Sequence, residues 1–247
     1  MSGHSKWATT KHKKNAIDQK RGILFTKLAN NITVAARSGG DINTNFNLRL
    51  AVERAKQASV PKENIDRAIQ RGTGAGEGVH LEEVTYEGLL SLPSPTGSTQ
   101  VAIILECLTD NTNRTVNELK HLFSDHAGSL AGPGAVVWMF EKKAVIAINK
   151  QEILNNDLET LELHLIDLGA SDLESKEDEI LIYSPVENLK RLKEALEKEN
   201  IKIESAALEY VAKEKIDLLD EQGVKVQNFF TILDENQDII NYYTNLK

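Results

Sequence analysis

The chain has 247 residues, of which 40% are hydrophobic and 27% are charged, and it carries a net charge of −8 at neutral pH. This composition is typical of a folded globular protein and excludes an intrinsically disordered chain. The longest apolar run, Ala135–Phe140, is too short for a membrane-spanning helix, and the single cysteine, Cys107, excludes an internal disulfide. With no apolar stretch near the N-terminus to act as a secretory signal, the sequence predicts a cytoplasmic protein without a membrane partner.

The charge is divided unevenly along the chain. Residues 1–80 contain 14 Lys+Arg and 6 Asp+Glu, whereas residues 81–247 contain 15 Lys+Arg and 31 Asp+Glu. Such asymmetry indicates that the basic part binds a polyanion while the acidic remainder stays away from it. A solvated basic tail with no partner is the alternative.

The basic charge is most concentrated in "GHSKWATTKHKKNAIDQKRG", residues 3–22. This segment has few apolar residues to bury, so we predict an exposed arm or a helical extension. Its lysines and arginine would neutralise phosphates with little sequence preference. Trp7 would stack on an unpaired base, or else pack against the following helices. We find no recognition helix or zinc finger that would read base pairs directly.

Residues 24–72 are predicted to form three short helices. The apolar positions of the first helix step by four, four and three: Leu24, Leu28, Ile32 and Ala35. That helix should end at Gly39-Gly40. A second helix should begin near Asn47, and a third should begin at Pro61 and end at Gly72. The glycine-rich segment 71–78 follows a helix and lacks a Lys-Ser/Thr pair, which favours a flexible linker over a phosphate-binding loop.

Strands and helices alternate after this linker. Residues 84–90 and 101–108 are β-like, with loop composition between them at 91–99. The polar run Thr109–Arg114 is either a functional loop or, as we favour, a lead-in that caps a helix ending at Gly128. After a turn at 131–134, residues 136–140 and 144–148 are expected to form a hairpin.

The order of elements from residue 144 is β-α-β-β-α-β, which is typical of a ferredoxin-like unit. Its first helix is marked by leucines from Leu154 to Leu168, and its second by an expected capping box from Ser184 to Glu187. A helix around Val226–Leu233 and a strand at 239–243 should follow. The predicted fold class is therefore α+β and multidomain, with divisions at 1–80, 81–134, 135–209 and 210–247.

No arrangement of residues indicates catalysis, a metal or a cofactor. His121 and His126 are five residues apart, whereas helical metal ligands are usually four apart, so surface or capping roles are favoured. Cys107 lies in an apolar strand and should be an unreactive core thiol. His4 and His12 could perform acid–base cleavage of RNA, but a binding arm has the same composition. A nuclease and a protein-interaction scaffold are the alternatives to nucleic-acid binding.

The sequence resembles the YebC/PmpR family, whose relatives include a mitochondrial translational activator of cytochrome c oxidase. The resemblance covers nearly the whole chain. It is carried by "GHSKWATTKHKKNAIDQKRGILFTKLANNITVAAR" at residues 3–37, "VPKENIDRAIQRGTG" at 60–74, "YEG" at 86–88, "ECLTDNTNRTV" at 106–116 and "VVWMF" at 136–140. The sequence departs from the family pattern at Leu89–Thr99.

The resemblance implies a helical bundle, an α+β domain built from residues 81–134 and about 210–247, and an inserted ferredoxin-like domain. It also implies a non-enzymatic DNA-binding regulator of transcription. The alternative is a ribosome-associated translation factor that contacts ribosomal RNA or tRNA and relieves stalling at proline-rich stretches. The expected nucleic-acid-binding residues are His4, Lys6, Trp7, Lys11, His12, Lys13, Lys14, Lys20, Arg21 and Lys27.

Overall fold

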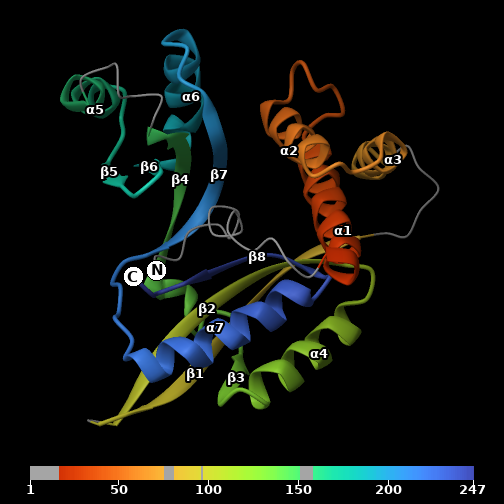
Figure 1. Ribbon diagram of the computed structural model, residues 1–247, viewed down its shortest axis with the longest axis vertical. Coiled ribbons are helices and arrows are strands. Elements are labelled where there is room, and N and C mark those ends of the chain that lie inside the picture. Colours follow the sequence, from red (N-terminus) through yellow and green to blue (C-terminus); the bar gives the residue numbers. More distant parts are fainter. Residues whose placement is uncertain (1–16, 75–80, 96, 151–157) are drawn as a thin grey trace. The chain divides into compact units, whose positions relative to one another are not determined.

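The computed structural model describes residues 17–74, 81–95, 97–150 and 158–247 (Figure 1). These residues form seven α-helices and two four-stranded sheets, which confirms the α+β class. The chain divides into two compact units, and the second is inserted into the first in sequence. Unit 1 comprises Met1–Glu141 and Val211–Lys247, and unit 2 comprises Lys142–Tyr210.

Unit 1 begins with the predicted three-helix bundle. Its helices are α1 (Ile17–Ala36), α2 (Phe46–Gln57) and α3 (Lys62–Gly72). Leu28, Ile32, Leu48, Val52 and Ile65 are buried in one shared core, as the apolar spacing predicts. Helix α1 begins before Leu24, so the described end of the basic segment is a helical extension of the bundle.

Helices α1 and α3 approach each other closely at Gly72. A Cβ atom at this position would collide with the Thr33 carbonyl oxygen and would lie 2.6 Å from the Ala36 Cβ. A hydrogen bond also joins the two helices here: the Thr33 hydroxyl on α1 donates to the Ala68 carbonyl oxygen on α3 at 3.2 Å. Glycine at this position therefore allows the backbones to pack against each other.

The first sheet joins the two segments of unit 1. Its strands are β1 (Glu82–Ser94), β2 (Gly97–Thr109), β3 (Gly128–Ala131) and β8 (Ile239–Thr244), in the order β3-β1-β2-β8 with antiparallel pairing. Helices α4 (Thr112–Ser124) and α7 (Asp220–Glu235) contribute to its core, where the rings of Phe123 and Phe229 meet edge to face at 5.0 Å. Because β8 pairs with β2, residues near the C-terminus complete a sheet that begins at Glu82.

The prediction of a loop at residues 91–99 is wrong. Strands β1 and β2 continue through this segment and pair until Ser94 meets Gly97. Leu92 is buried in the sheet's core, and the Pro93 carbonyl accepts a hydrogen bond from Gln222 Nε2 at 2.7 Å. Burial of Leu92 and this bond to α7 override the local preference of proline, serine and glycine for a turn.

The prediction of a strand at residues 136–140 is also wrong. Val137–Met139 form a single 3₁₀ turn, and one strand, β4 (Phe140–Asn149), follows in place of a hairpin. The carboxylate of Glu87 accepts hydrogen bonds from the backbone N–H groups of Val136 and Val137. These N–H groups are therefore not available to pair with a neighbouring strand.

The second sheet has the strand order β5-β6-β4-β7. The elements α5 (Leu158–Asp167), β5 (Asp172–Ser175), β6 (Glu179–Ser184), α6 (Leu189–Lys198) and β7 (Ile203–Ala212) follow β4 in the predicted β-α-β-β-α-β order. The start of the leucine-rich segment, residues 151–157, lies outside the described residues. The prediction of a capping box at Ser184 is wrong, because Ser184 belongs to β6 and a 3₁₀ turn (Val186–Asn188) precedes α6.

Candidate nucleic-acid interface

The predicted basic arm lies mostly outside the described residues. This applies to His4, Lys6, Trp7, Lys11, His12, Lys13 and Lys14, whose roles remain predictions, and to segment 75–80 of the predicted linker. The backbone of Lys20 and Arg21 belongs to α1. Lys27 is half-buried on α1, and its Nζ donates a hydrogen bond to the Leu233 carbonyl oxygen at 3.2 Å.

The described part of the bundle is basic in its own right. Residues 22–74 contain eight Lys+Arg and four Asp+Glu. Five of these eight cations are exposed. Arg37 is one of them and pairs with Glu83, and we call the other four the bundle cations: Lys56, Lys62, Arg67 and Arg71. Within the part of the chain that the structure describes, none of the four takes part in an ion pair or a side-chain hydrogen bond. Their charges are therefore available to an external anion.

The positions of the bundle cations follow from the packing of α3. Ile65 and Ala68 face the core, so the residues between them face solvent. Arg67 and Arg71 are four residues apart and share one face, about 6 Å apart along the helix axis. Lys62 is the first residue of α3, and Lys56 lies in the last turn of α2. Our sequence reasoning did not select these residues, because exposed charges on a helix are usually only solvated.

Arg114, in the other part of unit 1, has the opposite arrangement, with carboxylates around its charge. Its guanidinium lies 3.0 Å from Asp238 Oδ2, 2.9 Å from Asp110 Oδ1 and 3.8 Å from Glu118 Oε1. Hydrogen bonding to Asp238 raises the pKa of Arg114. This cluster joins the start of α4 to the segment before β8.

The polar run Thr109–Arg114 caps α4, as predicted. Asn111 is the N-cap residue, and its side-chain oxygen accepts the backbone N–H of Arg114 at 3.0 Å. Thr115 is buried and donates a hydrogen bond to Asp238 at 2.7 Å. The polar side chains of this run therefore make contacts within the protein, as expected for a helix cap.

His126 and Cys107, for which the sequence predicts structural roles, have structural contacts. His126 Nδ1 lies 2.8 Å from the Leu122 carbonyl oxygen, and its ring packs against Phe229. Cys107 is buried, which raises the pKa of its thiol to about 12 and keeps it unreactive at neutral pH, as predicted. Over the described ranges, we find no group of three or more metal-ligating side chains and no helix able to cross a membrane.

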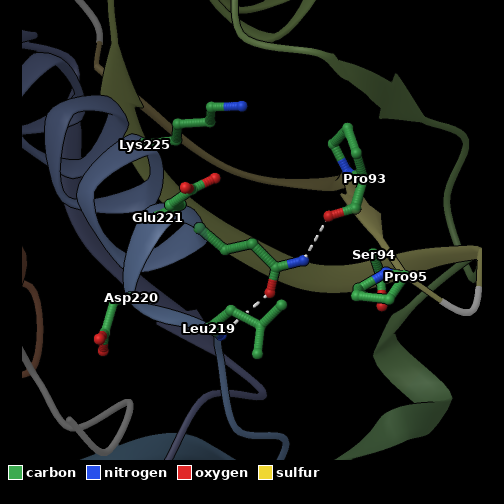
Figure 2. A pocket seen from close by; sticks show the side chains of 8 residues that line it. Pro93, Ser94, Pro95, Leu219, Asp220, Glu221 and Lys225 are labelled. Atoms are coloured by element: carbon green, nitrogen blue, oxygen red, sulfur yellow. Dashed lines mark hydrogen bonds between the residues drawn. The ribbon is translucent and has the colours of Figure 1, made fainter.

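A hollow of about 480 Å³ lies between the tip of the β1–β2 hairpin and the start of α7 (Figure 2). Pro93, Ser94 and Pro95 line one side, and Leu219, Asp220 and Glu221 line the other. The contact from Gln222 to the Pro93 carbonyl fastens the two sides together. The charged residues that line it are Asp220, Glu221 and Lys225, so carboxylates outnumber the single cation and the hollow suits a phosphate less well than the bundle cations do.

The relationship of the chain to known proteins agrees with the predicted resemblance. Residues 5–75 match the family profile described as the TACO1/YebC protein N-terminal domain, and residues 81–246 match that of the TACO1/YebC second and third domain. The chain therefore belongs to the TACO1/YebC family.

Individual relatives align over almost their full length. A probable transcriptional regulatory protein of Thermoanaerobacter pseudethanolicus is 44% identical, with 100% of this chain and 97% of the relative covered. A probable transcriptional regulatory protein of Thermotoga maritima is 45% identical, with 100% and 94% covered. The crystal structure of a conserved hypothetical protein, Aq1575 of Aquifex aeolicus, is 38% identical with a TM-score of 0.79, and the match covers 98% of this chain and 96% of that one.

Proposed function

We propose that this protein is a non-enzymatic, nucleic-acid-binding regulator of gene expression that contacts phosphates through its basic N-terminal region. The observation that carries the proposal is the set of four exposed bundle cations without ion-pair partners among the described residues. An unpaired, solvated cation can release phosphate counterions when it binds, whereas a cation already neutralised by carboxylates gains much less.

The predicted arm would extend the same interface. Lys6, Lys11, Lys13, Lys14, Lys20 and Arg21 would contact phosphates, and His4, Trp7 and His12 would approach bases or backbone. Lys27 would contribute least, because its amine already donates to the Leu233 carbonyl oxygen. Residues 81–247, for which we predict domains at 81–134, 135–209 and 210–247, contain 15 Lys+Arg and 31 Asp+Glu, and would keep most of the polyanion on the basic N-terminal region.

The nature of the nucleic acid separates two versions of this proposal. The names of the relatives, probable transcriptional regulatory proteins, support a regulator of transcription, which would act by binding DNA. The composition of the arm, with many lysines and a stacking ring but no evident groove reader, also suits unpaired RNA. In that alternative the protein acts on the ribosome as a translation factor that relieves stalling at proline-rich stretches.

A matched pair of variants tests the phosphate interface. The test variant changes Lys62, Arg67 and Arg71 to Ala, and the control changes Lys120, Lys198 and Lys225 to Ala. All six side chains are exposed, and both variants lose three positive charges. Fluorescence anisotropy with a labelled duplex and a labelled single strand, measured over a series of salt concentrations, gives the affinity and its salt dependence.

We expect the test variant to reduce the slope of log K against log salt by about two to three, while the control changes it by less than one. Equal slopes in the two variants would refute a specific role for α3.

Crosslinking in living cells distinguishes DNA from RNA. Ultraviolet light would join the protein to its nucleic acid, and both DNA and RNA would be sequenced, with Lys11, Lys13 and Lys14 changed to Glu as the control. Crosslinks at a few promoters would establish a transcriptional regulator. Arm-dependent crosslinks on ribosomal RNA or tRNA would establish the translation factor.

A further inference from the structure

Trp138 is the most unusual exposed side chain among the described residues. Its indole is 65% exposed, although tryptophan normally buries most of its surface. The flanking residues Val136 and Phe140 are both buried, so they anchor the chain on either side of the ring. An exposed aromatic ring on such a firmly held segment requires a physical reason.

The segment that carries Trp138 is fixed by a buried carboxylate. Glu87, on β1, accepts hydrogen bonds from the backbone N–H of Gly134 at 2.6 Å, of Val136 at 2.6 Å and of Val137 at 2.9 Å. Burial alone would raise the pKa of Glu87, but these three donors outweigh it and lower the pKa, so the carboxylate is charged at neutral pH. Gly134 has a φ of +88°, which a residue with a side chain adopts only with strain.

The indole itself is also held in place. Its Nε1 donates a hydrogen bond to the Ala135 carbonyl oxygen at 2.9 Å, three residues back in the chain. This bond uses the polar edge of the ring and leaves its π surface for stacking. A preorganised ring loses little conformational entropy when a ligand binds, which increases affinity.

A positive charge lies beside the backbone of Trp138. Lys213 Nζ donates a hydrogen bond to the Trp138 carbonyl oxygen at 2.7 Å, and the Lys213 backbone N–H bonds to the Met139 carbonyl oxygen at 2.9 Å. Lys213 is exposed, and an ammonium group has three donors, of which this bond uses one. Trp138 and Lys213 both belong to unit 1. A stacking ring with an adjacent cation matches a nucleotide, which combines a flat base with a phosphate.

A protein partner fits these observations less well. Protein-docking surfaces usually present a contiguous apolar patch, whereas the direct neighbours of Trp138, Val137 and Met139, are half-buried and Trp138 is the large hydrophobic residue that this segment exposes. The other large exposed hydrophobic side chains lie on different elements, such as Leu163 on α5 and Val224 on α7.

We propose that Trp138, preorganised by Glu87 and accompanied by Lys213, is a stacking platform for an unpaired nucleobase. The inference rests on the proposed nucleic-acid-binding function, and adds to it a binding point in the α+β unit with a preference for single strands. Stacking on an aromatic ring is tolerant of base identity, so this platform contributes affinity for unpaired bases without a sequence code.

The fluorescence of Trp138 provides a direct test. The chain has two tryptophans, Trp7 and Trp138, so Trp7→Phe leaves Trp138 as the only one. Phenylalanine keeps an aromatic ring at position 7, and every comparison is made within this background. The probes are oligouridine and oligodeoxythymidine of about 12 nucleotides and a duplex of the same length. Labelled copies of each probe report binding independently by anisotropy.

We expect either single strand to quench Trp138 emission at saturation, and the duplex to quench it much less because its bases are already stacked. Trp138→Ala should weaken single-strand binding by between about 5-fold and 100-fold, and Trp138→Phe should restore much of that loss. Because the side chain is exposed, neither variant should affect folding. Glu87→Gln should weaken the quenching by loosening the segment.

The outcomes separate the platform from the wider proposal. Binding by anisotropy with unchanged Trp138 emission overturns the platform and leaves the proposed function standing. Quenching without any loss of affinity in Trp138→Ala also overturns it, because the base would then be near the ring without stacking on it. The absence of binding to all three probes overturns both.

Discussion

The arginines of α3 in the bundle and Arg114 in the α+β part of unit 1 have opposite electrostatic surroundings. Lys62, Arg67 and Arg71 on α3 are exposed and have no ion-pair partner in the described chain, whereas Arg114 on α4 is surrounded by three carboxylates. Net charge alone does not reveal this difference. A cation can serve an external ligand only where the fold leaves it unneutralised, so the arrangement of acids around a cation is as informative as the number of cations.

The largest effect is expected from disrupting the bundle that displays the free cations. Gly72→Ala places a Cβ atom against the Thr33 carbonyl and Ala36, and should destabilise the bundle by about 3 kcal/mol. The exposed basic surface would then be lost together with nucleic-acid affinity. Chemical denaturation followed by circular dichroism measures this change in the free energy of unfolding.

Gly223→Ala in α7 is the matched control for Gly72→Ala. No atom lies within 4 Å of a Cβ at this helical position, so replacing glycine by alanine should stabilise α7 by about 0.5–1 kcal/mol. If both variants behave alike, close packing of α1 on α3 is not what maintains the bundle.

The second prediction concerns Glu87, the carboxylate that holds the segment before β4. Glu87→Gln replaces one acceptor oxygen with a donor facing backbone N–H groups, and should cost about 2 kcal/mol of stability at pH 7. Because the folded pKa of Glu87 is lowered, its contribution is complete above the unfolded pKa of about 4.3 and is lost as pH falls through the folded value.

The pH dependence of Glu87→Gln checks the sign of this effect. The difference in unfolding free energy between wild type and variant should be constant from about pH 6 to pH 8 and should shrink below about pH 4. A difference that grows on acidification would contradict the assignment of Glu87 as a charged acceptor.

The third prediction contrasts two arginines directly. Arg114→Met should lower stability by about 1 kcal/mol, because the ion pairs are partly exposed and solvent weakens them. It should leave nucleic-acid affinity unchanged, since the charge of Arg114 is already neutralised by Asp110 and Asp238. Thermal denaturation and anisotropy on the same preparations give both quantities.

The smallest expected effect on stability belongs to Arg67→Met. An exposed cation without an ion pair should change unfolding free energy by less than about 0.5 kcal/mol. Its removal should instead lower the salt slope of nucleic-acid binding by about 0.9. An Arg67→Met variant that loses stability and keeps its slope would reverse the comparison with Arg114.

Helix positions could be predicted well because they depend on local spacing. The spacing of Leu28 and Ile32, and of Leu48 and Val52, indicated the faces that the bundle buries. The hairpin tip was missed, because the burial of Leu92 depends on α7, which lies more than a hundred residues later. A local reading of proline, serine and glycine could not include that contact.

The candidate site was predictable only in part, for a similar reason. The concentration of lysines in the arm is visible in the sequence, but a free cation on α3 cannot be distinguished from a paired one on α4 without the positions of distant carboxylates such as Asp238. The strand expected at 136–140 failed because Glu87, almost fifty residues earlier, occupies its backbone donors. Long-range side-chain contacts decided both outcomes.

The pairing of β8 with β2 has a consequence for how the protein is made. About 130 residues separate the end of β2 from the start of β8. At typical synthesis rates the edge of β2 therefore stays unpaired for roughly 6 to 26 seconds before β8 is made. During that interval a long hairpin rich in isoleucine and leucine presents unpaired backbone groups, which is a hazard for aggregation. A nascent chain stalled or truncated before Ile239 would retain that exposed edge, and the last nine residues therefore protect the chain's solubility as well as completing its fold.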